Sequence, residues 1–460
     1  MFHVKQLNNV PRETFMDIHD DTIVAITSPC GVGGVSSIRM SGPRSLTIFN
    51  KIFSEELKTS HKVVHGWIKN ADKPTKIDET LAYFLAAPNS YTGENTVEIS
   101  CHGGKIVAEE VLNILITAGA RLAKNGEFTK RAFLNGKIDL SKAEAVVDIV
   151  SAKSIKAKNA AMAQLEGRLG KKIGEVRGRL VGLATEIEAG IDFPDDVNDR
   201  GQEQAKKAIN EGINEIDKII QTAEEGKVLR EGLRLAIIGK PNVGKSSLLN
   251  ALLGEERAIV TQTPGTTRDT IEETIIINGL PFIIIDTAGI RHPNDEAEKI
   301  GIERARLAAD IAEIALMVYD ATTGPNEANE EINVAACKKK IKVLNKIDLI
   351  NDPDKPGFIL ISAKTGEGIE KLKEEIYMLA MNGRQDKLID GVAINERHKE
   401  CLIRSKEALE KGLEAIAKKL PIDLIAIELH SAIIALGEIS GEAVSVEVIE
   451  SIFSRFCVGK

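Results

Sequence analysis

Eight consecutive residues, Gly239 to Ser246, carry the spacing G-x-x-x-x-G-K-S. They come directly after an apolar run at 235–238 and directly before a helical pattern at 247–253, which is the context that a phosphate-binding loop requires. In such a loop the glycines let backbone N–H groups turn toward phosphate oxygens, Lys245 neutralises the β- and γ-phosphates, and the Ser246 hydroxyl ligates magnesium. The motif alone leaves one alternative open, a glycine turn that joins a strand to a helix.

Two further segments predict that this loop belongs to a nucleotide switch. Asp286-Thr287-Ala288-Gly289 ends an apolar strand, so Asp286 can hold magnesium through water and the Gly289 N–H can sense a γ-phosphate. In the loop before it, the hydroxyl of Thr266 or Thr267 can complete the magnesium shell only while a triphosphate is bound. These segments therefore predict a structure that changes when the γ-phosphate is lost.

Another pair of segments predicts that the base is guanine. Asn345-Lys346-Ile347-Asp348 and Ser362-Ala363-Lys364 each follow an apolar strand. The Asp348 carboxylate can accept two hydrogen bonds from guanine N–H groups, whereas adenine offers an acceptor there, a difference on the order of several kcal/mol that excludes ATP. Lys346 can lay its stem on the base, and the Ala363 N–H can donate to the guanine carbonyl. The predicted GTP- or GDP-binding residues are Asn242, Val243, Gly244, Lys245, Ser246, Ser247, Asp286, Gly289, Asn345, Lys346, Asp348, Ser362, Ala363 and Lys364.

The residue that would orient the attacking water does not follow from the pattern of Ras-like proteins. A glutamine follows the D-x-x-G glycine in that pattern. Here Ile290 occupies the position, and an apolar side chain cannot position water. Either the protein does not hydrolyse the nucleotide, or a downstream acidic residue orients the water. The candidates for this residue are Asp295, Glu296 and Glu298.

The elements that must position these residues change in character along the chain. Residues 21–134 alternate short β-branched runs with glycine-rich turns, which predicts an α+β domain. From Leu165 to Ile187 apolar residues recur every three or four positions, which keeps one helical face apolar. Between Leu233 and Ala380 short apolar strands alternate with helical stretches, as in a mostly parallel α/β sheet. Helical patterns resume after Gly383, so the α/β unit is predicted to be an insertion.

We therefore predict a multi-domain α/β plus α protein with a P-loop, Ras-like G domain inserted in an all-helical domain. The N-terminal α+β domain covers residues 1–136. The helical domain has a first part at 137–227 and a second part at 382–460, and the inserted GTPase domain lies between them at 228–381.

Composition argues against several other classes of protein. No apolar run approaches the roughly 18 residues that a membrane span needs, and the N-terminus has no leader pattern, so we expect a soluble, cytoplasmic protein with no membrane partner. The five cysteines are dispersed and never spaced as C-x-x-C, which argues against a disulfide framework or a structural zinc site. A net charge of −8, with one Trp and four Tyr, means that any RNA contact must be local or supplied by a partner.

The switch segments resemble those of the MnmE (TrmE) family, which modifies the wobble uridine of tRNA. The resemblance lies in D-T-A-G followed by an apolar residue, in the G-T-T-R-D loop at Gly265 to Asp269, and in Asn242 within the phosphate loop. It implies that Glu298 orients the water and that a potassium ion takes the place of an arginine finger, a role worth roughly 10³ to 10⁵ in rate. The implied ligands are Asn242, Thr261, Thr263 and Thr266 for potassium, and Ser246 and Thr267 for magnesium.

These implied roles have plainer alternatives. Asn242 is at home in turns whatever it binds, and Glu298 could be a solvated residue in the first turn of a helix. Pro264 is a departure from the expected potassium loop, because proline removes one N–H and fixes φ.

The resemblance extends over the N-terminal domain, which is similar to the folate-binding domain of the same family. It lies in segments at 21–25, 33–43, 91–94, 102–104 and 126–137. It implies that this domain supports dimerisation and binds a tetrahydrofolate derivative carrying a formyl or methylene group. The implied folate-binding residues are Arg39, Glu98, Lys137 and Lys460. Taken singly, each of them could be a solvated surface charge.

The C-terminal segment Phe456 to Lys460 matches the family's C-x-G-K ending, which implies a role for Cys457 at the modification site, as a nucleophile or in packing only. Cys457, Glu298 and Lys245 are the predicted catalytic residues. The resemblance further implies a homodimer, and an FAD-dependent partner protein that joins it in a heterotetramer. Together they would add an aminomethyl or carboxymethylaminomethyl group to the 5-position of the wobble uridine of tRNA. The alternative is a ribosome-assembly or signalling switch that lacks one-carbon chemistry.

Overall fold

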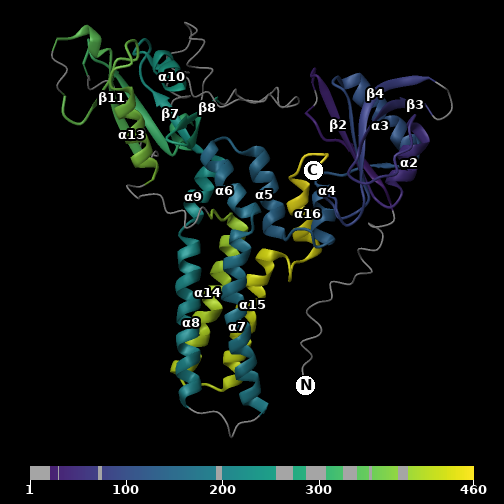
Figure 1. Cartoon of the computed structure of the whole chain (residues 1–460). Helices are drawn as coiled ribbons and strands as arrows, with labels where there is room; N and C mark the ends of the chain where they lie inside the picture. Colours follow the sequence, from purple (N-terminus) through teal and green to yellow (C-terminus); the bar gives the residue numbers. More distant parts are fainter. Residues whose placement is uncertain are drawn as a thin grey trace. The chain divides into compact units, whose positions relative to one another are not determined.

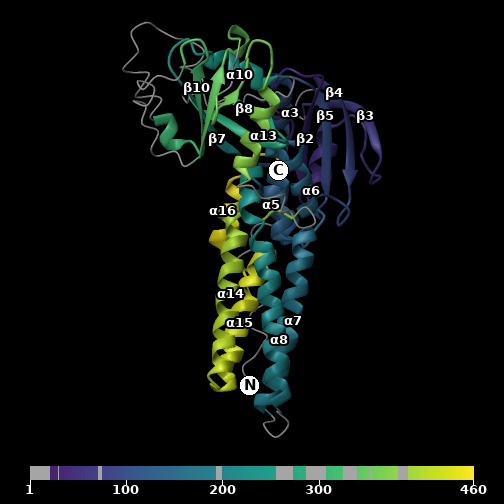
Figure 2. The ribbon, with the colours of Figure 1, turned by 90° about the vertical axis from the view of Figure 1, so that its left-hand side faces the viewer.

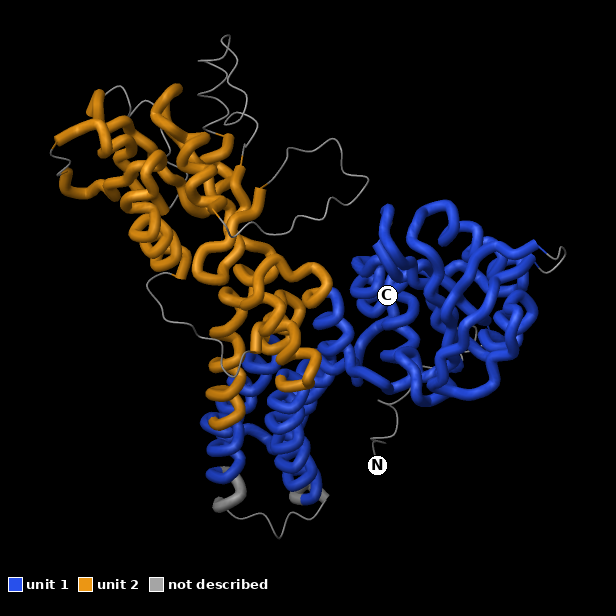
Figure 3. The backbone as a smooth tube through the Cα atoms, turned by 45° about the horizontal axis from the view of Figure 1, so that its top comes forward, with its two compact units in different colours: residues 1–147, 169–210, 404–460 blue, residues 148–168, 211–403 orange. Residues whose placement is uncertain are grey.

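The computed structural model describes residues 21–29, 31–70, 75–192, 199–254, 273–285, 307–324, 339–351, 355–381 and 392–460. The chain divides into two compact units, which Figure 3 shows in different colours. Unit 1 contains residues 1–147, 169–210 and 404–460, and unit 2 contains residues 148–168 and 211–403. Each unit therefore joins segments that are far apart in the sequence, and the division into four parts stays a prediction.

A six-stranded sheet forms the N-terminal part of unit 1, and its strand order is β3-β4-β5-β2-β1-β6. Figure 1 labels β2, β3 and β4 of this sheet. β1 and β6 are parallel, and the other neighbours are antiparallel. Helices α2 (Ser45–Ile52) and α3 (Lys105–Thr117) pack on the sheet through a buried core that includes Ile38, Phe49 and Val111. The strands are β1 (Ile23–Ile26), β2 (Val35–Ser41), β3 (Val63–Lys69), β4 (Lys76–Leu85), β5 (Thr96–His102) and β6 (Arg121–Leu122).

The sheet face opposite this core carries polar and aromatic side chains. Successive side chains of a strand point to opposite faces, so the sequence neighbours of the core residues lie on the other face. Arg39 of β2 is directly opposite Glu98 of β5, and Glu98 is directly opposite Tyr83 of β4. Strand pairing therefore brings these three side chains together from three different parts of the domain.

A buried ion network joins this sheet to helix α4 (Glu127–Leu134). The Arg131 side chain is fully buried, and its guanidinium donates to three carboxylates, including that of Glu127 at 3.1 Å. Arg121 donates to the same Glu127 carboxylate at 2.6 Å, and the Lys124 backbone N–H donates to it at 2.7 Å. Burial raises the pKa of Glu127, but the hydrogen bonds from Arg121 and Lys124 and the nearby positive charges outweigh burial, so the net pKa is lowered.

We expect Glu127 to stabilise the N-terminal domain only above acidic pH. Its folded-state pKa lies below its ordinary value of 4.5, so its contribution is complete above that value and is lost as the pH falls through the folded-state pKa. Trp67, the one tryptophan of the chain, lies in β3, so its fluorescence reports unfolding of this domain. Glu127→Gln should lower the free energy of unfolding by about 3 kcal/mol at neutral pH and by less at an acidic pH below 4.5. A difference from wild type that is equal at both pH values would contradict this role.

The helices of unit 1 include four long segments that lie side by side (Figures 1 and 2). Gly412 of α14 lies against Ile209 of α8 and Glu428 of α15, so the three helices are in contact at this level. None of the described helices combines the length and the apolar composition that crossing a membrane demands. The four helices are α7 (Arg168–Asp192), α8 (Asp199–Ile220), α14 (Glu396–Ala417) and α15 (Ile422–Ser440); Arg168 and residues 211–220 and 396–403 of these helices belong to unit 2.

The apolar stripe that predicts a long helix is buried in α7, with one correction at its start. Leu165 does not belong to this helix, because it is the last residue of α6 (Ile155–Leu165). Gly167, at φ +90, adopts a left-handed conformation that separates the two helices. The buried residues of the stripe are Leu169, Ile173, Val176, Leu180, Leu183 and Ile187.

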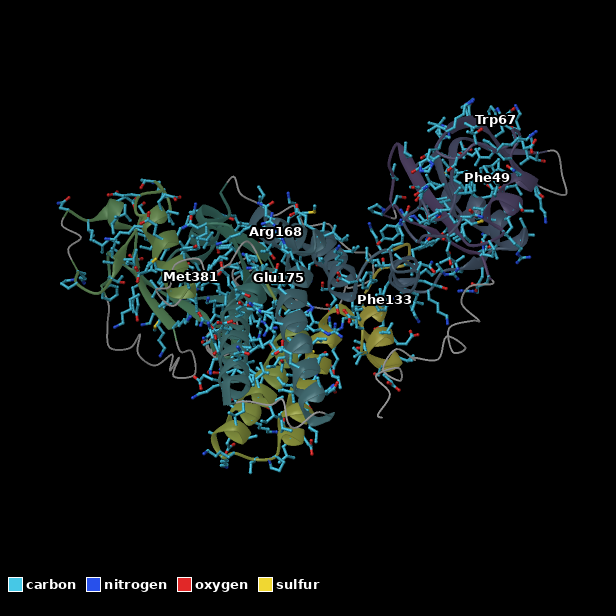
Figure 4. The ribbon with its side chains drawn as sticks, turned by 60° about the horizontal axis from the view of Figure 1, so that its bottom comes forward. Phe49, Trp67, Phe133, Arg168, Glu175 and Met381 are labelled. Carbon is cyan, nitrogen blue, oxygen red and sulfur yellow. The ribbon has the colours of Figure 1, made fainter. Side chains whose placement is uncertain are left out.

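Helix α16 (Val446–Ser454) brings the end of the chain back to the N-terminal domain. The ring of Phe453 packs near that of Phe133 in α4, with centroids 6.3 Å apart, and Phe133 is labelled in Figure 4. Leu140, the first residue of α5 (Leu140–Ser151), belongs to the same buried cluster. This packing fixes the start of the C-terminal tail beside α4.

The sheet of unit 2 has the strand order β12-β11-β10-β7-β9-β8. All neighbours are parallel except β8 and β9, so the mostly parallel sheet expected from the sequence is confirmed for the described part of the unit. β8 is absent from the sequence-based prediction, and it joins β9 through Asn278 and Gly279, whose positive φ angles suit a two-residue hairpin turn. The strands are β7 (Leu233–Ile238), β8 (Glu273–Ile277), β9 (Leu280–Ile285), β10 (Ile314–Asp320), β11 (Lys339–Asn345) and β12 (Ile359–Leu360).

The helices of unit 2 pack on this sheet through one large apolar core. Leu248 of α10 and Leu372 of α13 are fully buried in it, together with strand residues such as Val343. Parallel strands that are buried on both faces need continuous apolar sequences, which explains the strand pattern that marked this segment. The helices are α6, α9 (Ala223–Glu231), α10 (Lys245–Leu253) and α13 (Ile369–Ala380).

Candidate functional site

The predicted phosphate-binding loop connects β7 to α10. Two of its glycines leave no room for a side chain, because a Cβ on Gly239 would lie 2.5 Å from the Val318 carbonyl oxygen and one on Gly244 would lie 2.3 Å from Asn345 Nδ2. Gly244 also has φ +93, a conformation that favours glycine. The glycine spacing of the motif is therefore imposed by the neighbouring strands β10 and β11, which contribute Val318 and Asn345.

Lys245 begins α10, and its ammonium turns back on the loop. Its Nζ donates to the carbonyl oxygens of Gly239 and Lys240, both at 2.8 Å, and burial lowers the pKa of Lys245. Burial disfavours the charged form of this lysine, and a nearby anion stabilises that form. The position therefore suits a phosphate group. Ser246 and Ser247 are exposed in the first turn of the helix, where backbone N–H groups and the helix dipole also favour anions.

The segment predicted to read the base packs directly on the phosphate loop. Asn345 Nδ2 donates to the Val243 carbonyl at 2.9 Å, and Asn345 Oδ1 accepts from the Ala363 N–H at 2.9 Å. Asp348 is exposed, and its Oδ1 accepts from Ser362 Oγ at 2.7 Å, which orients the carboxylate. One buried asparagine thus holds together three segments of the chain, since Val243 lies 102 positions and Ala363 lies 18 positions from Asn345.

Lys346 makes a second connection between the same two segments. Its Nζ donates to the Asn242 carbonyl at 2.7 Å and to Asp320 Oδ2 at 2.6 Å. Asp320 was not among the predicted site residues. Its position as the last residue of a buried strand was the available signal, because the carboxyl ends of parallel strands meet at the edge where ligands bind.

Several predicted residues of this site lie outside the described residues, so their roles stay predictions. They are Thr261, Thr263, Thr266, Thr267, Asp286, Gly289 and Glu298, together with Ile290 and the alternative candidates Asp295 and Glu296. Lys364 is described and is exposed beside Ala363.

In the N-terminal domain, the structure brings together two of the residues with an implied role in folate binding. Arg39 Nε donates to Glu98 Oε1 at 2.6 Å, and these side chains are only 18% and 10% exposed. They are therefore not the solvated surface charges of the plainer alternative. The Arg39 guanidinium also lies over the rings of Tyr91, at 4.9 Å, and Phe128, at 5.6 Å.

Two tyrosines border this pair. Burial raises the pKa of Tyr83, and the negative charge of Glu98 raises it further, against the opposing effect of Arg39. Burial also raises the pKa of Tyr91, although its hydroxyl is hydrogen-bonded to Thr129 at 2.9 Å. Both phenols are thus kept neutral and can donate or accept a hydrogen bond. Tyr83 was not singled out from the sequence, because only strand pairing places it beside Glu98.

The C-terminal tail, Phe456 to Lys460, docks against the N-terminal end of α4, where Phe128 lies. The Phe128 N–H donates to the Lys460 carbonyl at 3.2 Å, so the last residue of the chain lies beside one of the rings under Arg39. Gly459 has φ +97, and a Cβ there would lie 2.5 Å from the Ile26 carbonyl oxygen. Cys457 is exposed, so its thiol does not serve as core packing.

Lys137, the fourth residue with an implied role in folate binding, is exposed and contacts the loop that precedes β5. Its Nζ donates to the Pro88 carbonyl at 2.9 Å, and its stem lies against Gly93. This loop also carries Tyr91. Lys137 is therefore connected to Arg39 and Glu98 only through that loop. Among the described residues, no hydrogen bond joins Lys137 directly to either of them.

Residues 22–137 of the chain match the family described as GTP-binding protein TrmE N-terminus, and residues 140–457 match the MnmE helical domain. A relative from a Thermoanaerobacter species is 44% identical over 457 residues, which cover 96% of this chain and 99% of the relative. Relatives from Acetivibrio thermocellus and a Cyanothece species are 42% and 41% identical, over 96% and 93% of this chain and 99% and 96% of their own lengths. All three are named tRNA modification GTPase MnmE.

Proposed function

The chain belongs to the MnmE (TrmE) family, and we propose on this basis that it hydrolyses GTP and takes part in the modification of the wobble uridine of tRNA. The observation that supports GTP as the nucleotide is the packing of the base-reading segment on the phosphate loop. Asn345 and Lys346 each donate to a carbonyl of that loop, and Ser362 orients the Asp348 carboxylate. A purine held at Asp348 would then have its phosphates at the start of α10.

The residues of the site suit a magnesium-bound triphosphate. Lys245 and the N-terminal N–H groups of α10 would hold the phosphates, and the exposed Ser246 hydroxyl would ligate magnesium together with Thr267. Magnesium and potassium would supply positive charge that stabilises the transition state. Glu298 would orient the attacking water. The proposed potassium ligands are Asn242, Thr261, Thr263 and Thr266, and Asp286 and Gly289 would complete the switch.

We further propose that a tetrahydrofolate derivative binds beside Arg39 and Glu98. The Glu98 carboxylate can pair with the amino and ring N–H groups of a pterin, and the cations of Lys137 and Lys460 can meet the glutamyl carboxylates. The largely buried Arg39–Glu98 pair and its aromatic neighbours support this proposal, because a buried charge pair on a sheet face suits a polar, planar ligand. The exposed Cys457 lies in the docked tail, close enough in sequence to Lys460 to act at the same site.

By family, the proposal includes a homodimer and a second protein that carries FAD and acts with this chain on tRNA. Mass spectrometry of wobble nucleosides tests the whole proposal. Cells that lack this protein should lose the aminomethyl-type modification, and the wild-type gene should restore it. If the wobble positions stay unmodified after complementation, although the supplied protein still hydrolyses GTP, the alternative of a ribosome-assembly or signalling switch is favoured.

Gly459→Val should separate the two proposed activities. The new side chain cannot be accommodated against the Ile26 carbonyl, so the tail should leave its position beside Phe128, and folate affinity should fall by roughly tenfold or more. GTP turnover should stay at the wild-type value. Equilibrium dialysis with formyltetrahydrofolate and a GTPase assay on the same protein measure both effects.

Gly119→Val is the matched control for this variant. Gly119 also has a positive φ, +116, but a Cβ there would meet nothing within 4 Å. It therefore imposes similar backbone strain without displacing the tail. Equal losses of folate affinity in the two variants would reject the role of the docked tail.

A further inference from the structure

The carboxylate of Asp320 is the one acidic contact of Lys346 among the described residues. Asp320 is the last residue of strand β10. This strand lies between β7, which leads into the phosphate loop, and β11, which leads into the base-reading segment. Asp320 Oδ2 accepts from Lys346 Nζ at 2.6 Å, and the Asp320 side chain is only 12% exposed. The Lys346 side chain is 31% exposed, so the pair is partly shielded from water and its attraction is screened less than that of a fully solvated pair.

Asp320 is itself held in place from the other side. Its Oδ1 accepts from the Thr322 N–H at 2.9 Å and from Thr322 Oγ1 at 2.7 Å. Burial raises the pKa of Asp320, but the hydrogen bonds from Lys346 and Thr322 outweigh burial and lower it. The carboxylate is therefore charged at neutral pH, and both of its oxygens have donors.

The other end of this chain of contacts is the phosphate loop. The same Lys346 ammonium donates to the Asn242 carbonyl at 2.7 Å. Both residues have left-handed backbone conformations, with φ +70 at Lys346 and φ +64 at Asn242, which are uncommon for residues other than glycine. Such conformations persist only where surrounding contacts hold them. The lysine ammonium, anchored on Asp320, supplies one of those contacts.

We propose that Asp320 is a positioning residue of the nucleotide site: it anchors Lys346, which in turn holds the Asn242 carbonyl and so keeps the phosphate loop and the base-reading segment in one preformed arrangement. The inference rests on the proposed nucleotide site. Without the carboxylate, the long lysine side chain regains rotamer freedom, and the loop loses a charge-assisted hydrogen bond. Bound nucleotide should then leave faster, because the protein spends less time in the arrangement that holds both base and phosphates.

Asp320→Asn tests this by removing the charge at nearly constant volume. The dissociation rate of fluorescently labelled GDP from the full-length protein should rise by about tenfold or more, with a matching rise in KM for GTP. Turnover at saturating GTP should change less than KM does, because Asp320 would not touch the reacting atoms. The melting temperature of the nucleotide-free protein should stay close to that of wild type.

Glu370→Gln is the matched control. Glu370 also forms an ion pair with a lysine, Lys373, at 2.7 Å, but the glutamate is 82% exposed and the pair lies within one helix. Solvated pairs of this kind contribute little. The control should therefore leave GDP dissociation at the wild-type rate.

Thr322→Val provides a second variant that keeps the charge. It removes the Oγ1 donor to Asp320 and leaves the backbone donor, so GDP dissociation should rise by about two- to fivefold. Wild-type dissociation rates in both Asp320→Asn and Thr322→Val would overturn the proposal, as would an equal rise in Glu370→Gln. If Asp320→Asn does not fold, a wild-type rate in Thr322→Val alone overturns it. Failure of the nucleotide site itself is distinguishable, because the wild-type protein would then not bind GDP.

Discussion

Asp348→Asn should change the preferred nucleotide from guanosine to xanthosine triphosphate. The Asp348 carboxylate is exposed and is oriented by Ser362, so it can accept hydrogen bonds from both N–H groups on that edge of guanine. An amide presents one acceptor and one donor, and its donor would face a guanine N–H. Affinity for GTP should therefore fall by roughly 10³, because a charge-assisted bidentate contact is replaced by one hydrogen bond and one unpaired group.

Xanthine carries a carbonyl where guanine carries its amino group, so the amide donor gains a partner in that complex. Competition of GTP and xanthosine triphosphate against labelled GDP measures the exchange of preference. Glu367→Gln, an exposed carboxylate-to-amide change in the loop that follows Ser362, is the control and should leave the preference unchanged. Unaltered GTP selectivity in Asp348→Asn would mean that another group reads the base.

Glu298→Ala should reduce GTP hydrolysis by about 10² or more and leave GTP binding intact, as expected for a residue that orients water. The expectation follows from Ile290, which cannot take this role, and from the family to which the chain belongs. Binding should persist because the residues proposed to hold base and phosphates, Lys245, Asn345 and their neighbours, are unchanged in this variant.

Two neighbouring carboxylates provide the controls for this variant. Asp295→Ala and Glu296→Ala remove the other two acidic candidates from the same stretch of sequence. Single-turnover hydrolysis and GDP affinity, measured for all three variants in potassium buffer, identify the group that orients the water. Wild-type hydrolysis in Glu298→Ala, with a loss in one of the other two, would transfer the role to that residue.

Local sequence predicted those parts of the molecule whose residues are close together along the chain. The phosphate loop is one example, because G-x-x-x-x-G-K-S covers the end of one strand and the start of the next helix, and covalent geometry leaves it few conformations. The α7 stripe is another, since the apolar spacing matches the helical period directly. Its first residue was assigned wrongly because a period does not reveal where Gly167 interrupts a helix.

Contacts between segments that are distant in the sequence could be identified only from the fold. Arg39 and Glu98 were identified only through resemblance to a family, and strand pairing explains why two charges 59 residues apart make one buried pair. For Asp320 the sequence offered only its position at the end of a buried strand, because its contact with Lys346 exists only where β10 lies beside β11.

The sequence alone thus determined which chemical groups the protein has for holding a guanine nucleotide, and in which order they occur along the chain. The tertiary structure decided which of them touch: Asn345 and Lys346 on the phosphate loop, Asp320 on Lys346, and the C-terminal tail on α4. The physical reason is that residue spacing restricts only local backbone geometry, whereas strand order and packing, which depend on the whole core, determine the neighbours of each side chain.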